Sequence, residues 1–486
     1  RTRGAGGMTR RVASAVVFGA SAAVLVVELA AVRLLAPYVG QSLETFTAIV
    51  TVVLAGISFG TWMGGRAADR SGDLPRLIGS ELLVGGALAI AVVPLIDLVG
   101  PLVAGAGGAG LILIAIVALF APSAFLSAVS PAVVRLSLAS LDETGATVGR
   151  YSAIGTAGAI LGSLATGFVL VPLIGTTAIV VGTGALAVLA GTAVRVRRLA
   201  TLLAVIGALV VGASLAVVAG DRCDHETRYY CVRILEDPER ESGRRLVLDD
   251  LSHSYVDLDD PTHLEFAYTR MLAAVANAQA PGRVDVTFLG GGAFTLPAWL
   301  DAERPGSTST VLEVDTALPG IVAQELPPPP RIPTHLLLGD GRASMRTLAD
   351  ESADVVVGDA FGGRAVPWHL TTVEFNDDID RILRRDGLYI ANVIDGPRME
   401  LVRAIASTLG ETWPHVAVLT TPERFEQGGN LVVAASHAPI DSDAVIAENL
   451  AFGLDVIVLT GTDLDAFVDG AQVLTDDHAP VDQLLG

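Results

Sequence analysis

Long apolar stretches with few charges dominate the first 220 positions of the chain. A helix that crosses a hydrocarbon core of about 30 Å needs about 20 such residues. A cleaved leader would account for the first stretch alone. The pattern therefore predicts a multispan α-helical membrane domain with about seven helices. The expected spans are 12–36, 45–65, 77–99, 109–135, 151–172, 176–194 and 199–219.

After residue 220 the pattern changes to short apolar runs between polar turns. Runs at 232–235 and 245–249 flank a polar turn at Ser242 and Gly243, which predicts a β-hairpin. From residue 284 onward, strand-like and helical patterns alternate, which predicts a parallel sheet with crossover helices. The expected strands are 284–289, 311–315, 336–338, 355–357, 388–393 and 431–435. The expected domains are a membrane domain (1–220), a β-hairpin and connecting helix region (221–283) and an α/β domain (284–486).

Charge divides the chain at the same point. Residues 1–220 contain thirteen Arg and eight acidic residues, whereas residues 221–486 contain nineteen Arg and forty-four acidic residues. So negative a domain repels phosphates, which argues against nucleic acid as a partner. An acidic surface suits a cationic ligand, but solubility alone is the more common reason for such a surface.

Arginine placement predicts how the membrane domain is oriented. Arginines precede the first expected span and lie between the second and third, the fourth and fifth, and the sixth and seventh, while the connections 97–108 and 173–176 contain none. Because arginine is enriched on the cytoplasmic side, we expect a multi-pass protein of the cell membrane with a cytoplasmic N-terminus. Seven spans then place the soluble domain outside the cytoplasm.

Two cysteines, Cys223 and Cys231, follow the last expected span. A metal site would need two further ligands, and only His225 lies nearby in the sequence. Either a small disulfide or two inert thiols fits the spacing. A disulfide would agree with an oxidising compartment outside the cytoplasm.

Small residues recur at four-residue spacing in two of the expected spans, which predicts close helix packing. They are Gly56, Gly60 and Gly64, and Gly155, Ala159, Ser163 and Gly167. Three acidic residues lie in or beside the expected spans: Glu28, Glu44 and Glu81. A carboxylate inside a membrane is costly and predicts a functional role. For Glu28 the alternative is an ion pair with Arg33. Residues 60–70 also resemble the glycine-rich loop of major-facilitator transporters.

The candidate chemistry follows successive strands of the α/β domain, because ligands of such sheets bind at the carboxyl ends of the strands. A glycine-rich turn lets a ligand approach the backbone, and an acid after the second strand accepts hydrogen bonds from ribose hydroxyls. Three strand-end carboxylates without a phosphate-neutralising lysine favour an S-adenosyl compound over a dinucleotide. The candidates are Gly290, Gly291 and Gly292, then Glu313, then Asp340 and Gly341, and then Asp359.

Taken in order, these motifs resemble the spermidine synthase (polyamine aminopropyltransferase) family, and in particular its membrane-fused bacterial branch. The matching segments are 246–249, 265–268, 289–292, 313–315, 339–341, 355–359 and 474–482, with 28–37 of the first span. The resemblance implies a class I methyltransferase-like (Rossmann-like) fold with a small N-terminal β-hairpin region. It implies no permanently bound cofactor, and decarboxylated S-adenosylmethionine or a related nucleoside as co-substrate.

The resemblance also implies a role for each motif residue. Glu313 would bind the ribose hydroxyls and Asp340 the adenine amine, beside the glycine turn and Gly341. Asp359 would orient and deprotonate the attacking amine, and Tyr268 would wall the amine channel. His253, which replaces an expected glutamine, would lie near the nucleoside.

Several positions depart from the family pattern. Ala293 and Gly362 replace two acids, and Thr269 and Arg270 replace a His-Glu pair. A diammonium substrate needs a carboxylate at each end, and Arg270 would add repulsion. The departures therefore argue against putrescine as the acceptor.

Three functions fit the sequence. The first is a membrane-bound, spermidine synthase-like aminopropyltransferase. The second is a catalytically altered nucleoside- or polyamine-binding domain that regulates a transporter-like membrane half, and the third is an S-adenosylmethionine-dependent methyltransferase. The expected partners are the lipid bilayer and a small-molecule amine or nucleoside, with a homodimer as one possible assembly and no metal. Asp340 and Asp359 could instead be turn residues, and His253 and His369 are expected in loops or at the surface.

Overall fold

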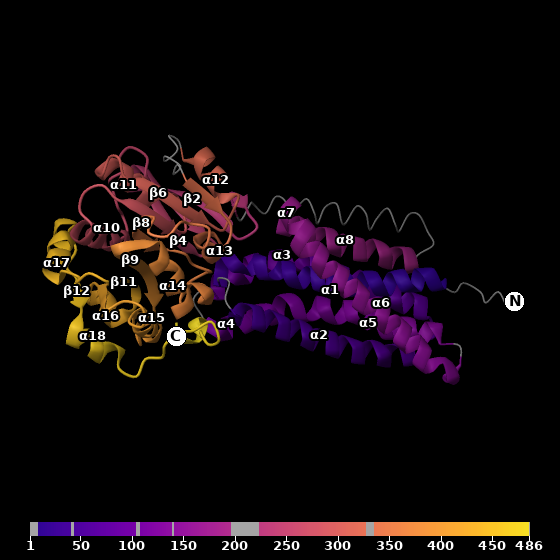
Figure 1. Ribbon diagram of the computed structural model, residues 1–486. Helices are drawn as coiled ribbons and strands as arrows, with labels where there is room; N and C mark the ends of the chain where they lie inside the picture. Colours follow the sequence, from indigo (N-terminus) through magenta and orange to yellow (C-terminus); the bar gives the residue numbers. More distant parts are fainter. Residues whose placement is uncertain are drawn as a thin grey trace. The chain divides into compact units, whose positions relative to one another are not determined.

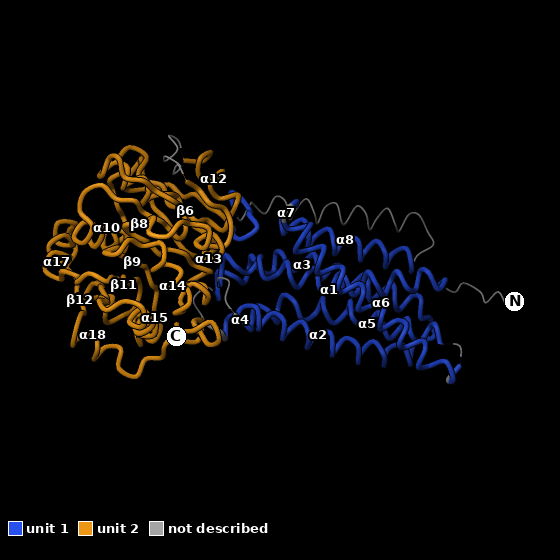
Figure 2. The backbone as a smooth tube through the Cα atoms, viewed as in Figure 1, with its two compact units in different colours: residues 1–231 blue, residues 232–486 orange. Residues whose placement is uncertain are grey.

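The computed structural model describes residues 8–39, 43–103, 107–138, 140–195, 223–326 and 335–485. They form two compact units, residues 1–231 and residues 232–486 (Figure 2). The expected span at 199–219 and the proline run at 327–330 lie outside the described residues.

The first unit consists of long helices (Figure 1). Among the described residues, six helices are long and apolar enough to cross a membrane: Arg10–Val39, Glu44–Arg70, Leu74–Val103, Ala109–Ser137, Thr144–Leu170 and Thr176–Arg195. The elements are α1 (Arg10–Val39), α2 (Leu43–Arg70), α3 (Leu74–Val103), α4 (Gly107–Ala115), α5 (Ala121–Ser137), α6 (Thr144–Ala165), α7 (Val171–Leu173) and α8 (Thr176–Arg195), with π-helical turns η1 (Ile116–Phe120) and η3 (Thr166–Leu170) and a 3-10 turn η2 (Leu141–Glu143). Each of the first six expected spans thus corresponds to one of these helices.

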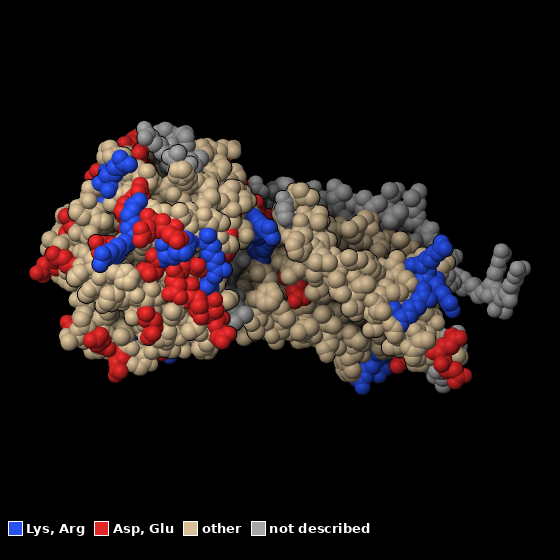
Figure 3. All heavy atoms as spheres, in the orientation of Figure 1, with Lys and Arg blue, Asp and Glu red and all other residues tan. Residues whose placement is uncertain are grey.

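Large apolar side chains cover the outside of these helices. Leu102, Leu173 and Phe168 are 79%, 75% and 71% exposed. The visible face of this unit is largely uncharged along its length, with charged side chains gathered at one end (Figure 3). Exposure on this scale is unfavourable in water but suits a hydrocarbon environment.

Glycines bring neighbouring helices of this unit into contact. A Cβ at Gly60 or Gly64 of α2 would overlap the carbonyl oxygen of Ala124 or Ala128 in α5. The predicted close packing of α2 is therefore confirmed. For α6 the prediction was partly wrong, because Gly158, and not Gly167, approaches the backbone of α1.

This contact predicts a large effect of one methyl group. We expect Gly60→Ala to lower the thermal stability of the full-length protein by about 1–3 kcal/mol, since the added methyl must force α2 and α5 apart. Gly167→Ala is the matched control, because nothing lies within 4 Å of its Cβ position. Equal melting temperatures of the two variants in detergent would contradict this packing.

Two predictions about polar groups in this unit need correction. Arg33 does not pair with Glu28. Its side chain lies 3.5 Å from Glu226 and donates hydrogen bonds to the carbonyl oxygens of Thr227 and Arg228. Residues 60–70 form the end of helix α2 and not a loop. Glu28 and Glu81 are both buried, whereas Glu44 is exposed in the first turn of α2.

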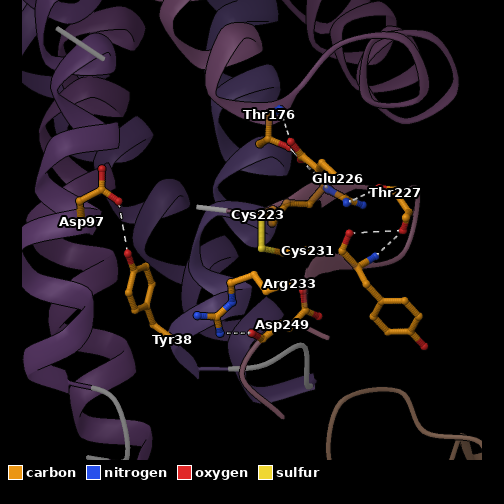
Figure 4. The surroundings of a disulfide bond; sticks show 11 residues. Tyr38, Asp97, Thr176, Cys223, Glu226, Thr227, Cys231, Arg233 and Asp249 are labelled. Atoms are coloured by element: carbon orange, nitrogen blue, oxygen red, sulfur yellow. Dashed lines mark hydrogen bonds and ion pairs between the residues drawn. A yellow bond between two sulfur atoms is a disulfide. The ribbon is translucent and has the colours of Figure 1, made fainter. Parts of the chain in front are cut away.

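A disulfide between Cys223 and Cys231 closes a short loop at the end of this unit (Figure 4). Glu226, inside the loop, accepts hydrogen bonds from the backbone N–H and the hydroxyl of Thr176, the first residue of α8. Because Arg33 of α1 binds the same loop, the disulfide-closed loop fastens α1 to the beginning of α8. The spacing allowed either a disulfide or two free thiols, and the structure contains the disulfide.

The disulfide predicts how the thiols react. We expect unreduced full-length protein to show no maleimide labelling, because its only two cysteines are bonded to each other. Because Cys231 is buried, the labelling is done in denaturant. Under these conditions a reducing agent should make both thiols reactive, and Cys223→Ser should leave Cys231 reactive without reduction. Labelling of the unreduced wild-type protein would contradict the pairing.

A four-stranded antiparallel sheet precedes the α/β domain, in the order β1-β2-β3-β4. Its strands are β1 (His225–Glu226), β2 (Cys231–Asp237), β3 (Arg240–Leu248) and β4 (Leu251–Asp257). The predicted hairpin is present, but its turn was misplaced. The chain reverses at Pro238 and Glu239, whereas Ser242 and Gly243 lie within β3.

The second unit is built around an eight-stranded sheet with the order β12-β10-β11-β9-β8-β5-β6-β7. Strands β7, β6, β5, β8 and β9 are parallel, whereas β11, β10 and β12 pair antiparallel. The bounds are β5 (Asp285–Leu289), β6 (Thr308–Glu313), β7 (His335–Leu338), β8 (Ala353–Gly358), β9 (Leu383–Asp395), β10 (His415–Thr420), β11 (Gly429–Ser436) and β12 (Ile457–Leu459). The predicted parallel sheet is present from β5 to β9, but the expected strand 431–435 is β11 and pairs antiparallel. Strands β10 and β12 were not predicted from the pattern.

Helices lie on both faces of this sheet (Figure 1). Because side chains alternate along a strand, Phe288 faces Leu272 of α10 and Trp299 of α11, whereas Leu289 faces Leu409 of α15. Strands buried on both faces are apolar throughout, which explains their pattern in the sequence. The helices are α10 (Ala267–Gln279), α11 (Thr295–Glu303), α12 (Leu318–Glu325), α13 (Gly341–Met345), η4 (Trp368–Leu370), α14 (Val373–Ile382), α15 (Glu400–Leu409), α16 (Pro422–Gln427), α17 (Ser442–Ala451), α18 (Gly461–Val468) and α19 (Val481–Leu484).

Candidate functional site

The candidate site lies beside β5, whose parallel neighbours in the sheet are β6 and β8. Crossover connections diverge at such a point and leave a crevice at the carboxyl ends of the strands. Gly290 follows β5 with a φ of +92°, and a Cβ there would overlap the carbonyl oxygen of Asp359. Glycine is therefore required where the turn after β5 meets the residue that follows β8.

Glu313 ends β6 and holds the glycine turn. One carboxylate oxygen accepts the N–H of Gly291 at 2.8 Å and the other accepts the N–H of Asp315 at 2.8 Å. Burial raises the pKa of Glu313, and these hydrogen bonds oppose the rise in part. Each oxygen keeps a second lone pair, so Glu313 can accept hydrogen bonds from a ribose while it holds the turn.

Asp340 follows β7 and begins helix α13. Its Oδ1 accepts the N–H of Ala343 at 2.9 Å, and its Oδ2 lies 2.9 Å from Nε2 of His369. Burial opposes ionisation of Asp340, but the hydrogen bonds from Ala343 and His369 lower its pKa. The side chain is about half exposed, at 48%. Asp340 therefore caps a helix, as the turn interpretation held, and still presents a carboxylate to solvent beside Gly341.

Asp359 lies in a partly buried hydrogen-bonded network at the end of β8. Its Oδ1 accepts the side-chain N–H of Asn392 at 2.9 Å, and its Oδ2 lies 3.4 Å from the hydroxyl of Tyr268. Burial raises the pKa of Asp359 to about 6, although these two hydrogen bonds lower it in part. A carboxylate with this pKa is ionised at neutral pH yet basic enough to take up a proton, as a general base requires.

Tyr268 and His253 border the same network. The Tyr268 hydroxyl also lies 3.1 Å from the carbonyl oxygen of His253, and burial raises the pKa of Tyr268 well above its usual value. Burial lowers the pKa of His253 to about 4, so its ring is neutral at physiological pH. The expectation of a loop or surface histidine was wrong for His253, which lies within β4 with its ring 6.4 Å from that of Phe361.

The departures from the family pattern have structural consequences. Ala293 is fully buried, and its N–H donates to the hydroxyl of Ser254. The N–H of Gly362 donates to the carbonyl oxygen of Ala365 in a turn after Asp359. The guanidinium of Arg270 donates to the carbonyl oxygens of Phe452 and Glu265 and keeps its positive charge, so the repulsion of a cationic substrate stays a prediction.

Four residues of the site were not found as site residues from the sequence. Asn392 and Asn430 lie in apolar strands without a motif, and Ser254 and His369 are far in sequence from the groups they bind. Only the three-dimensional pairing of strands brings them to the crevice. Among the described residues, no group of three or more His, Cys, Asp or Glu side chains is placed to hold a metal ion.

The pKa of Asp359 predicts the pH dependence of turnover. Because the base must be ionised, kcat/KM should rise with pH through about 6 and level off above that value. The measurement is kcat/KM of the full-length protein across this range. A profile that is flat through pH 6, or that falls as the pH rises, would contradict a role for Asp359 as base.

These features define a class I methyltransferase-like α/β domain with carboxylates at its strand ends. The described part of the same chain also contains six long apolar helices. No family model matches the chain. The chain is 29% identical over 137 residues to a polyamine aminopropyltransferase of Vibrio vulnificus. This match covers 28% of this chain and 45% of that protein. The matched region thus spans about half the length of the curated relative.

Solved structures resemble the second half of the chain. A probable spermidine synthase from Corynebacterium glutamicum is 27% identical with a TM-score of 0.48, and the match covers 53% of this chain and 97% of that one. Spermidine synthase from Thermotoga maritima is 21% identical with a TM-score of 0.34, over 45% of this chain and 70% of that one. The match to the curated relative confirms the predicted resemblance to the spermidine synthase (polyamine aminopropyltransferase) family.

Proposed function

We propose that this protein is a membrane-bound aminopropyltransferase that uses decarboxylated S-adenosylmethionine, or a closely related sulfonium nucleoside, and a primary amine. The observation that carries the proposal is the partly buried carboxylate of Asp359, which binds Asn392 and Tyr268, at the position where the backbone of Asp359 packs against Gly290 of the glycine turn. Glu313 and Asp340 lie at the ends of the neighbouring strands β6 and β7, and in this proposal they bind the ribose and the base of one nucleoside.

The proposed reaction is a direct displacement. The lone pair of the neutral amine attacks the carbon beside the sulfonium, the carbon–sulfur bond breaks, and its electrons leave on sulfur as a neutral thioether. Asp359 first accepts a proton from the bound ammonium group and so supplies this neutral amine, and the product amine leaves in its protonated form. Tyr268 remains protonated, because burial raises its pKa, and its hydroxyl is placed to steady the ionised carboxylate. The domain contributes mainly alignment and one base.

Donor choice tests this function against a methyltransferase. The full-length protein, purified in detergent, is incubated with an amine and either decarboxylated S-adenosylmethionine or S-adenosylmethionine. We expect 5′-methylthioadenosine from the first donor and no S-adenosylhomocysteine from the second. S-adenosylhomocysteine formation would indicate a methyltransferase, and nucleoside binding without turnover of either donor would indicate a binding domain.

We also propose that the soluble unit faces the outside of the cell. Helix α8 runs for 20 residues from Thr176 to Arg195, about 30 Å. The disulfide-closed loop binds α8 at Thr176, so the chain has returned to the starting end of α8 by Cys223. Arg195 and Cys223 therefore lie at opposite ends of α8, and the disulfide itself suits an oxidising compartment. The donor would then have to be available on that side of the bilayer.

Reporter fusions test the orientation. Alkaline phosphatase fused after residue 231 should be active, and a fusion after Arg195 should be inactive, because these points lie at opposite ends of α8. Activity only after Arg195 would reverse the orientation. In that case the soluble unit would share the cytosol with its donor.

A further inference from the structure

The closing segment of the chain, residues 474–478, is fastened firmly to the second unit. Leu474 is fully buried, and both its backbone N–H and its carbonyl oxygen are hydrogen-bonded to other parts of this unit. Thr475 and His478 then exchange two backbone hydrogen bonds and so close a tight turn. The exposed turn between them carries Asp476. The position of this carboxylate is therefore set by the core below it.

Asp476 binds the guanidinium of Arg342 with both of its carboxylate oxygens. Nη1 of Arg342 donates to Oδ1 at 2.7 Å, and Nη2 donates to Oδ2 at 3.0 Å. Oδ1 also accepts the hydroxyl of Thr372 at 2.8 Å. These hydrogen bonds, above all those from Arg342, lower the pKa of Asp476, so the carboxylate is ionised at neutral pH. A paired contact between an arginine and a carboxylate fixes the direction of both groups.

Arg342 joins the closing segment to the side of the candidate site that Asp340 forms. It is the second residue of α13, the helix that Asp340 caps. Only 10% of its side chain is exposed. Besides Asp476, it donates to the carbonyl oxygen of His369 and to the carboxylate of Asp378, both at 3.3 Å. The two hydrogen bonds to Asp476 are shorter than these, so Asp476 is the main partner that holds the guanidinium.

His369 links this arginine to the carboxylate of Asp340. Its Nε2 lies 2.9 Å from Oδ2 of Asp340, while its carbonyl oxygen accepts the N–H of Arg342. Because Asp340 and Arg342 are two positions apart in the chain, the three residues close a small ring of contacts. Oδ2 of Asp340 keeps one further lone pair, and its direction depends on where His369 lies. The acceptor that Asp340 offers to a ligand is thus oriented by Arg342.

We propose that Asp476 is a positioning residue of the nucleoside site, which acts through Arg342 to orient the Asp340 carboxylate toward the amine of the base. The inference rests on the proposed function, in which Asp340 receives that amine, and it gives the closing segment a part in the selection of the base. Without the carboxylate of Asp476, Arg342 would turn toward Asp378 and release the carbonyl oxygen of His369.

Binding of adenosine and inosine to the full-length protein in detergent tests this role by calorimetry. Adenosine offers an amine to the Asp340 carboxylate, whereas inosine turns a carbonyl oxygen toward it. The wild type should therefore prefer adenosine at least about tenfold, the usual contribution of a hydrogen bond to a charged group. Asparagine at position 476 cannot accept both N–H groups of Arg342, so Asp476→Asn should lower this preference at least about fivefold.

A matched control and a second variant accompany this measurement. Asp477→Asn removes the same charge from the next, exposed position and should leave the preference unchanged. Arg342→Lys keeps the positive charge but loses the paired geometry. It should lose the preference as well, and it is the second variant if Asp476→Asn does not fold. The melting temperature in detergent shows which variants are folded.

A merely structural role of Asp476 predicts a different result. A loosened fold would weaken the binding of adenosine and inosine by the same factor and leave the preference as it was. That result in a folded Asp476→Asn or Arg342→Lys variant overturns the proposal, as does unchanged binding of both nucleosides. Equal binding of adenosine and inosine by the wild type overturns it too, since Asp340 would then not receive the amine of the base.

Failure of this inference differs from failure of the proposed function. Turnover of decarboxylated S-adenosylmethionine by the wild type, together with an unchanged preference in Asp476→Asn, would keep the transferase and overturn the role of Asp476. Loss of the preference in Asp476→Asn, without turnover of any donor by the wild type, would support the positioning role and contradict the transferase.

Discussion

The Asp359→Asn variant should release thioether nucleoside about 10²–10⁴ times more slowly than the wild-type protein, the usual contribution of a positioned general base. Asparagine has nearly the same shape and can still accept the hydrogen bond from Asn392, but it cannot accept a proton. The measurement is kcat/KM for 5′-methylthioadenosine formation. The rise of the rate with pH through about 6 should disappear in the same variant.

Nucleoside binding provides the control for this variant. Asp359→Asn should bind 5′-methylthioadenosine as the wild type does, because Glu313 and Asp340 carry the predicted nucleoside contacts. Retention of more than about a tenth of the wild-type rate would show that proton transfer to Asp359 is not part of the reaction.

The Glu313→Gln variant should bind nucleosides about 10–100 times more weakly, since a hydrogen bond to a charged group contributes about 1.5–3 kcal/mol. The wild-type protein should prefer adenosine to 2′-deoxyadenosine, because only adenosine offers the full pair of ribose hydroxyls. The variant should lose most of this preference. Titration of both proteins with both nucleosides, followed by calorimetry, measures the effect.

This comparison separates the ribose contact from the structural role of Glu313. Glutamine loses one of the two hydrogen bonds from the backbone, that of Gly291 or that of Asp315. This loss weakens the binding of both nucleosides equally. Only a lost ribose contact removes the discrimination between them. Glu411→Gln, at an exposed position, is the matched control. Unchanged discrimination in Glu313→Gln would place the ribose elsewhere.

The sequence determined the architecture well where one physical constraint was sufficient. The length of the apolar stretches predicted six helices that the structure describes, because bilayer thickness sets that length. Which small residue touches a neighbour depends on how a helix is rotated against its partner. Spacing alone therefore pointed to Gly167, whereas Gly158 makes the contact.

Local polarity misled the prediction of the hairpin. Ser242 and Gly243 have the composition of a turn, yet both lie in β3. Glycine is required at position 243 of this strand for another reason. A Cβ there would overlap the hydroxyl of Tyr255, which comes from the neighbouring strand β4. When the residue at a position is determined by a side chain from another strand, the neighbouring sequence does not reveal its role.

The strand-end carboxylates could be predicted because they recur at the ends of apolar runs, but their partners could not. Asp359 is held by Asn392, 33 positions away, and Asn392 by Asn430, 38 positions further on. Each asparagine is one polar residue in an apolar strand. Its role follows from the antiparallel pairing of β9 with β11, which long-range packing decides.

The central claim is that the crevice beside β5 transfers an aminopropyl group from a sulfonium nucleoside to an amine. The most direct measurement uses decarboxylated S-adenosylmethionine with isotopic carbon in the aminopropyl chain, n-propylamine as acceptor, and mass spectrometry of both products. We predict labelled N-propyl-1,3-diaminopropane and unlabelled 5′-methylthioadenosine in equal amounts from the wild-type protein, and neither from Asp359→Asn. Intact donor with every amine tested, although 5′-methylthioadenosine binds, would contradict the claim.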